Sequence, residues 1–212
     1  MQPAEPTLAT SLTLAREAFM QPFLDPASIR KLLTGAAANL MPPLGILAAG
    51  YTLRTLRAVL GGERRTLPNW DGLMDLILGG LKLFLVHAAY VGVPLLLQHL
   101  GVGPPLFLVV LSLAALLNPM AQVCFAEQDQ LAAAFALPAL VSRIRKDLRR
   151  YLHATAVWYG TIFLLVLLLQ GTNPALAWFL LAFVGFYLSL VFAGLFGRIG
   201  AAGAQPLAKD PD

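Results

Sequence analysis

The chain has 212 residues, of which 58% are hydrophobic and only 12% are charged. So little polar surface cannot cover a water-soluble globule, so composition excludes a soluble domain and predicts one membrane domain. The net charge of +4 does not indicate nucleic-acid binding, because the basic residues flank apolar segments and form no separate patch with exposed aromatics.

The sequence contains no recognisable catalytic or cofactor-binding motif. Cys124 is the single cysteine, so neither a disulfide nor a cysteine-based metal site is expected. Phosphate-binding loops, nucleophile elbows and histidine pairs at metal-binding spacing do not occur. We therefore predict a protein that is not an enzyme and binds no cofactor or metal. The N-terminus lacks the pattern of a cleaved signal peptide, so the chain is expected to insert through its own spans.

The N-terminal third begins with polar, proline-bearing residues 1–10, which are expected to be disordered. Residues 11–31 predict an interfacial segment, in which a helix starts at the N-cap residue Ser11 and ends near Pro22. A second helix is expected to open at Asp25, because the proline that follows it suits a first helical position.

Residues 32–60 allow two alternatives. Leu32 to Leu53 is long enough to cross a membrane, but Pro42 and Pro43 at its centre should break or kink a helix. Basic residues flank both ends, which a single span disfavours. The segment is either a re-entrant hairpin that turns at the prolines, shielded by other parts of the protein, or a kinked span. The charges favour the hairpin.

Four further apolar segments predict four spans, at residues 81–100, 106–124, 152–169 and 174–197. The turns between the first two and between the last two carry no Lys or Arg and are expected outside the cell. Residues 127–150 predict a basic amphipathic helix in the interface, and residues 201–212 predict a disordered tail.

Basic residues are concentrated in two connections that should lie on the same side of the membrane. Under the positive-inside rule that side is the cytoplasm of a prokaryotic cell, where these residues would contact anionic lipid headgroups. They are Arg54, Arg57, Arg64, Arg65, Arg143, Arg145, Lys146, Arg149 and Arg150. Between Arg65 and the next span, Pro68, Trp70 and Asp71 predict a structural turn, with Asp71 as the cap of the following helix.

A few polar residues fall within or beside the apolar segments, where an unpaired polar group is costly. They should face a bundle interior or a wet cavity, and could line a path through the membrane. The candidates are His87, Tyr90, Asn118, Gln122 and Asp129. The alternative is hydrogen bonding between helices without transport.

Small residues at four-residue spacing predict close helix contacts, within the chain or between copies. These pairs are Ala88 with Gly92 and Ala193 with Gly197.

One set of residues resembles the signature of a known family. The set comprises Phe23, Asp25, Pro26, Lys31 to Leu33, Gly50, Tyr51, Leu53, Arg54, Leu56, Arg57, Gly62, Glu63, Leu67 to Asp71, Asp75, Leu76, Gly79 to Lys82, Tyr90 and Pro94. It is similar to an uncharacterised bacterial and archaeal membrane-protein family, domain of unknown function 4013. Arg64, Arg65 and Asn69 depart from that pattern, in which acidic residues are usual. The resemblance implies a prokaryotic membrane location and no reaction.

The sequence as a whole predicts an all-α, polytopic membrane bundle with four to five membrane segments and interfacial amphipathic helices. The expected function is a non-enzymatic scaffold or accessory subunit that binds the cytoplasmic leaflet and organises a membrane complex or the bilayer. The alternative is a small transporter or channel. Expected partners are anionic lipids and other membrane subunits or further copies of the chain, with no nucleic acid.

Overall fold

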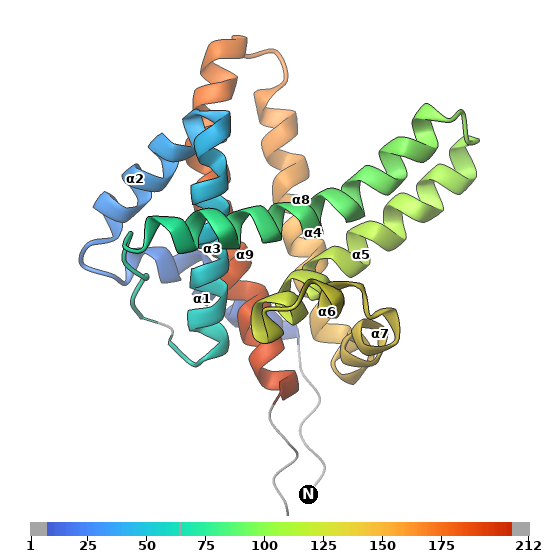
Figure 1. Ribbon diagram of the computed structural model, residues 1–212, viewed down its shortest axis with the longest axis horizontal. Helices are drawn as coiled ribbons and strands as arrows, with labels where there is room; N and C mark the ends of the chain where they lie inside the picture. Colours follow the sequence, from blue (N-terminus) through green and yellow to red (C-terminus); the bar gives the residue numbers. More distant parts are fainter. Residues whose placement is uncertain (1–7, 64, 205–212) are drawn as a thin grey trace, which may run out of the picture.

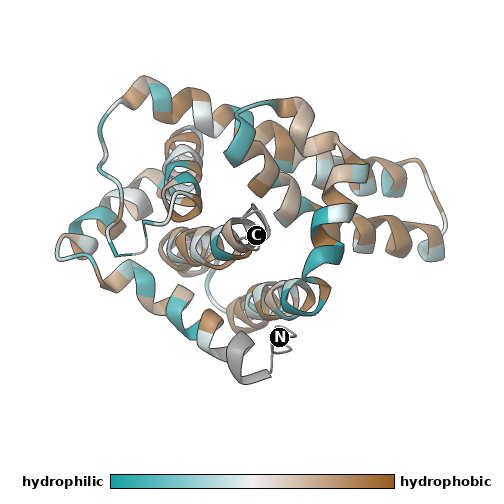
Figure 2. Cartoon of the chain, turned by 90° about the horizontal axis from the view of Figure 1, so that it is seen from below, coloured by the Kyte–Doolittle hydropathy of each residue, from teal (hydrophilic) through white to brown (hydrophobic). Residues whose placement is uncertain are grey.

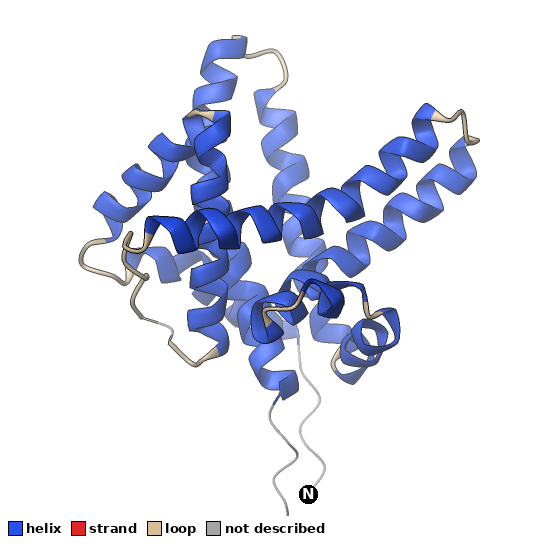
Figure 3. Cartoon of the chain, in the orientation of Figure 1, coloured by secondary structure: helices blue, strands red, loops and turns tan. Residues whose placement is uncertain are grey.

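The computed structural model describes residues 8–63 and 65–204, and the regular structure within these ranges is entirely helical (Figure 3). Four helices are long and apolar enough to cross a membrane. They are α4 (Leu73–His99), α5 (Pro104–Gln128), α8 (Leu148–Leu169) and α9 (Pro174–Ala204). The predicted all-α fold with four such helices is confirmed, and each helix is longer than the apolar segment that predicted it.

These helices form two hairpins that share a base and diverge from it (Figure 1). Helices α4 and α5 are joined through Gly101 (φ 75), and α8 and α9 through Gly171 (φ 83), both in the left-handed region that glycine tolerates. Prolines at the first positions of α5 and α9 start the returning helices, because the amide they lack has no partner there. Each uncharged turn is thus a tight reversal.

Helices α2 (Ser28–Leu40) and α3 (Gly45–Leu60) occupy the segment for which two alternatives were predicted. The helix breaks at Met41, and Pro42–Leu44 forms a short 3-10 helix, η2. In Figure 1, α2 rises to this break and α3 descends from it, which is the course of the hairpin alternative.

Helix α9 covers the tip of the α2–α3 hairpin and satisfies its polar groups. The indole of Trp178 donates to the carbonyl of Leu40 (3.2 Å), and Asn39 Nδ2 donates to the carbonyl of Ala182 (3.1 Å). Backbone that is broken at membrane depth needs such protein partners, since lipid offers none.

The N-terminal and basic segments differ from the predicted boundaries. Helix α1 (Leu8–Met20), followed by the 3-10 helix η1 (Gln21–Phe23), begins before Ser11 and inside the stretch predicted to be disordered. Residues 1–7 lie outside the described part of the chain. Helix α9 likewise continues into the predicted disordered tail, of which residues 205–212 are not described.

The basic segment 127–150 is not one helix, as predicted, but two short ones. They are α6 (Leu131–Phe135) and α7 (Leu137–Lys146). Asp129 interrupts the chain before α6 with a left-handed backbone (φ 52), and Asp147 (φ −139, ψ 50) separates α7 from α8. The apolar spacing predicted the helical character but not these interruptions, because tertiary packing overrides the local preference for a helix.

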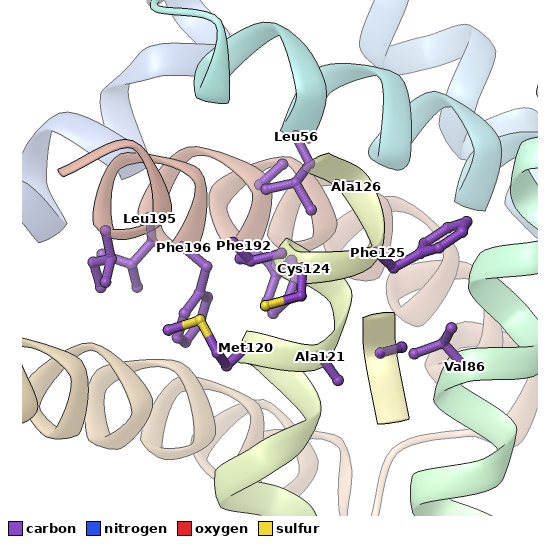
Figure 4. Close-up of a cluster of buried hydrophobic side chains, with 14 of the residues drawn as sticks. Leu56, Val86, Met120, Ala121, Cys124, Phe125, Ala126, Phe192, Leu195 and Phe196 are labelled. Carbon is purple, nitrogen blue, oxygen red and sulfur yellow. The ribbon is translucent and has the colours of Figure 1, made fainter. Parts of the chain in front are cut away.

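The main hydrophobic core lies where the two hairpins meet. Figure 4 shows Leu56 of α3 and Val86 of α4 among side chains from the second halves of α5 and α9, including Phe125 and Phe196. Cys124 is buried in the same cluster. Because the core occupies the base, the ends of the hairpins extend beyond it.

Helices α3 and α4 cross with their backbones in direct contact. A Cβ atom on Gly50 would lie 1.9 Å from the carbonyl oxygen of Leu76, and one on Gly80 would lie 1.9 Å from that of Ile46. Only glycine fits at such a crossing. Of the predicted small-residue contacts, Gly197 does lie against α3, but nothing lies within 4 Å of a Cβ on Gly92.

Candidate functional site

A buried ion pair closes the base of the α2–α3 hairpin. Lys31 Nζ lies 2.8 Å from Asp25 Oδ2, and both side chains are buried. The same carboxylate accepts from the amides of Ala27 (2.7 Å) and Leu67 (2.9 Å), and Lys31 also donates to the carbonyl of Leu67. The pair therefore ties the start of the hairpin to the loop that follows it.

These contacts set the charge of Asp25. Burial by itself would raise the pKa of the Asp25 carboxyl. The hydrogen bond from the Lys31 ammonium and those from the two amides outweigh burial, so the pKa of Asp25 lies below its ordinary value. Asp25 is therefore ionised at neutral pH, and the ion pair is intact there.

The loop before α4, which contains Pro68, Trp70 and Asp71, folds back onto α3. The ring of Trp70 stacks on that of Tyr51, with centroids 4.1 Å apart and planes 9° from parallel. The indole nitrogen of Trp70 donates to the carbonyl of Lys31 (3.2 Å), and the Tyr51 hydroxyl donates to that of Pro68 (2.8 Å). Trp70 thus links α2, α3 and the loop.

Asp71 does not cap α4 as the sequence predicted. Its carboxylate pairs with Arg54 of α3, and the residue before the helix is Gly72, whose positive φ of 61 turns the chain into α4. The partner of Asp71 is 17 residues away in the sequence, so the capping pattern alone could not reveal it.

Replacing Trp70 by alanine is expected to destabilise the protein by about 2–4 kcal/mol, because the ring stack and the bond to Lys31 are both lost. Thermal unfolding in mild detergent measures the change. The Trp70→Phe variant keeps an aromatic ring on Tyr51 and should recover more than half of the loss. Equal destabilisation by both changes would contradict the stacking role.

Ion pairs join the two basic connections at the base. Arg57 Nη2 lies 2.7 Å from Asp129 Oδ1, and Lys82 approaches the same oxygen at 3.4 Å. Figure 2, which views the molecule from below, shows hydrophilic residues on the short helices and connections there. The structure therefore brings residues 54–57 and 129 together at one end.

The predicted headgroup-binding residues fall into two groups. Four are paired with carboxylates of the chain itself: Arg54, Arg57, Arg143 and Arg150. Four others are exposed and make no ion pair within the described residues: Arg65, Arg145, Lys146 and Arg149. Arg64 lies outside the described residues. Charges of the second group are the ones available to lipid.

Asp129 lies at this base, where it pairs with Arg57. Burial would raise the pKa of its carboxyl, but the hydrogen bond and charge of Arg57, with a further contribution from Lys82, hold that pKa below its ordinary value. Its backbone ends α5 in the left-handed conformation (φ 52).

The left-handed backbone of Asp129 restricts which residues can replace it, whatever their charge. Asp129→Val should destabilise the protein by about 1–2 kcal/mol, because a β-branched residue strongly disfavours a positive φ. Asp129→Gly should be more stable than Asp129→Val. Thermal unfolding of each variant in the same detergent measures the difference. A valine variant as stable as the glycine variant would contradict the observed turn.

A cavity of about 290 Å³ lies between the hairpins. Apolar side chains form most of its wall, and none of the residues that line it is charged. Its polar lining comes from five helices: Thr52, His87, Asn118, Gln122, Tyr159 and Ser189. Four of these lie within two residues of the midpoints of α4, α5, α8 and α9, in that order: His87, Asn118, Tyr159 and Ser189.

Hydrogen bonds connect the polar lining. Asn118 Nδ2 lies 3.1 Å from His87 Nδ1, and Gln122 Nε2 donates to Asn118 Oδ1 (3.1 Å). Pro119 lacks the amide that would bond to the carbonyl four residues earlier, and the Tyr159 hydroxyl donates to that carbonyl, of Ala115, at 2.9 Å. The carbonyl left free by Pro119 thus joins α5 to α8 beside the cavity.

The five predicted path residues occupy three places. His87, Asn118 and Gln122 meet in the cavity, whereas the Tyr90 hydroxyl donates to the carbonyl of Ala134 in α6 (2.7 Å) and Asp129 lies at the base. Sequence reasoning missed the other three polar lining residues, Thr52, Tyr159 and Ser189. Each of these three residues could have been identified in the sequence by one feature, a hydroxyl group near the middle of an apolar helix.

Among the described residues, no three His, Cys, Asp or Glu side chains are grouped to hold a metal ion.

Residues 34–113 match the model of a family described as "Protein of unknown function (DUF4013)", so the family resemblance is confirmed over that part of the chain. The matched range contains the α2–α3 hairpin from Thr34, the Trp70 loop and α4. No curated protein and no solved structure matches the chain.

Proposed function

Starting from a family match that carries no activity, we propose that the protein is a non-enzymatic membrane scaffold or accessory subunit held at the cytoplasmic leaflet by its base. The observation that carries this proposal is the exposure of α8. Only 6% of its most apolar stretch is buried within the chain, against 56% for α9. A spanning helix with so few buried residues leaves much of its surface for lipid or another helix.

Helix α8 also has a site suited to close helix contact. No atom lies within 4 Å of a Cβ placed on Gly160, near the middle of the helix, so another backbone could approach there. Large apolar side chains such as Phe163 surround this face and are exposed. These features support a partner helix, from another subunit or a second copy.

The base supports binding to anionic lipid. Arg65, Arg145, Lys146 and Arg149 are exposed. Each basic side chain near an anionic leaflet contributes about 1 kcal/mol of attraction. Ion pairs inside the base hold the connections that carry these charges in place. Their cytoplasmic location stays a prediction of the positive-inside rule.

Oligomeric state in mild detergent tests the proposal. We expect native mass spectrometry of the purified full chain to show a discrete oligomer or a complex of fixed stoichiometry. Gly160→Leu should dissociate it, because the new side chain occupies the contact. The comparison is Gly92→Leu, at a glycine in α4 that also has open space around it, and dissociation by that variant instead would place the contact on α4. A parent protein that is monomeric, or an assembly that stays intact in the Gly160→Leu variant, would refute the role of α8.

One observation favours the transport alternative, namely the cavity at the middle of the spans. Substrate sites of transporters lie at this depth. A path would require access from the aqueous phase, and Tyr90 and Asp129 do not extend the polar lining in either direction. An Asn118→Cys variant, with Cys124 replaced by alanine, distinguishes the two: labelling by membrane-impermeant maleimide from both sides supports transport, and protection from both sides supports the scaffold.

A further inference from the structure

The cavity between the hairpins places hydrogen-bonding side chains at a depth where lipid would otherwise surround them. Asn118 and Gln122 are more than nine-tenths buried, whereas His87, at the middle of α4, is exposed toward the cavity. Polar groups at mid-membrane cost free energy unless they have partners. A ligand with its own donor and acceptor would supply the partners that lipid tails lack.

The direction of the hydrogen bonds indicates what such a ligand must offer. Because Asn118 Oδ1 accepts from Gln122, its Nδ2 donates to His87 Nδ1, and the proton of the neutral imidazole is then on Nε2. Within the described residues, neither this Nε2–H group nor Gln122 Oε1 makes a hydrogen bond. If the oxygen and nitrogen of both side-chain amides, of Asn118 and Gln122, are interchanged, the donor and the acceptor exchange places. The hydrogen-bond chain then still ends in one unused donor and one unused acceptor.

The uncharged lining and the small volume of the cavity further restrict the class of ligand that fits it. No charged residue lines the cavity, so an ionic head would enter mid-membrane without a counter-charge, at a cost of several kcal/mol. A volume of about 290 Å³ holds a small head but not a whole lipid. Aromatic side chains flank the polar groups, among them Phe84, Trp158 and Phe192. Because few residues in the apolar stretch of α8 are buried, acyl chains can leave between the hairpins into the bilayer.

We propose that this cavity binds the head of an uncharged, hydroxyl-bearing lipid of the diacylglycerol class. The hydroxyl donates to the carbonyl end of the His87–Asn118–Gln122 chain, an ester carbonyl of the same head accepts from the imidazole end, and the acyl chains lie against α8 and the surrounding bilayer. This inference goes beyond the scaffold role and does not require a partner subunit.

Binding to the purified full chain in mild detergent tests it, with dioctanoylglycerol as the probe and native mass spectrometry and thermal unfolding as readouts. We expect saturable binding of one probe and a raised unfolding temperature. Two probes with similar chains serve as controls: trioctanoylglycerol lacks the free hydroxyl, and dioctanoyl phosphatidic acid carries a charged head. Both should bind at least about tenfold more weakly, because one loses a hydrogen bond and the other buries a charge.

Two variants connect binding to the named residues. His87→Phe alters an exposed side chain, so it should fold normally and weaken dioctanoylglycerol binding about tenfold. Asn118→Leu interrupts the chain at its centre and should weaken it further. Gln98→Leu, near the far end of α4 and outside the cavity, is the control and should leave affinity unchanged. Absence of saturable binding, equal binding of the three probes, or an unchanged His87→Phe affinity would each overturn the proposal. The oligomer test of the scaffold role is read independently of all three.

Discussion

Replacing Gly80 by alanine is expected to destabilise the protein by about 3 kcal/mol, in the upper part of the range for overpacked sites. The added methyl group would lie 1.9 Å from the carbonyl oxygen of Ile46 and 2.8 Å from the amide nitrogen of Gly50. Both are backbone atoms of α3, so no side chain can rotate away and the two helices must separate. Thermal unfolding in mild detergent measures the loss.

The same substitution at Gly92 is the matched control, because it lies in the same helix with no atom within 4 Å of the new methyl group. Alanine favours a helix over glycine by up to about 1 kcal/mol, so Gly92→Ala should leave the unfolding temperature unchanged or raise it. We therefore expect the unfolding temperature to fall in Gly80→Ala and to stay unchanged or rise in Gly92→Ala. If both variants unfold at the same temperature, the backbone contact between α3 and α4 is wrong.

Replacing Lys31 by methionine is expected to destabilise the protein by about 3–5 kcal/mol, because Asp25 would keep a buried charge without its partner. The double variant Asp25→Asn with Lys31→Met removes both charges and should recover much of that loss. Asp71→Asn breaks an exposed pair and should change stability by less than about 1 kcal/mol. A double variant no more stable than Lys31→Met would contradict the ion-pair explanation.

Acid should remove the contribution of the same pair. The folded-state pKa of Asp25 lies below the ordinary value of 3.8, so its ionised form stabilises the fold at pH values above that value. The contribution is lost as the pH falls through the lower, folded-state pKa. Unfolding temperature measured from neutral pH down to strongly acidic pH should therefore decline less steeply for Asp25→Asn than for the parent. Parallel declines would show that another group dominates acid unfolding.

Several features that depend on short stretches of sequence were predicted correctly. Four apolar segments predicted the four long helices, because the length and hydrophobicity of a spanning helix are local properties. Pro42 and Pro43 predicted the break between α2 and α3, since a missing amide donor acts within one helical turn. Polarity inside apolar segments also identified His87, Asn118 and Gln122, half of the polar lining of the cavity.

Contacts between distant residues were decided by the tertiary structure. Leu67 completes the Asp25 site from 42 residues away, and Asp71 pairs with Arg54 instead of capping α4. The sequence by itself determined which segments prefer lipid to water, because that preference is summed along each segment. Only the packing of helices decided that Gly80 meets α3 while Gly92 meets nothing, because side-chain partners across a bundle depend on how its helices cross.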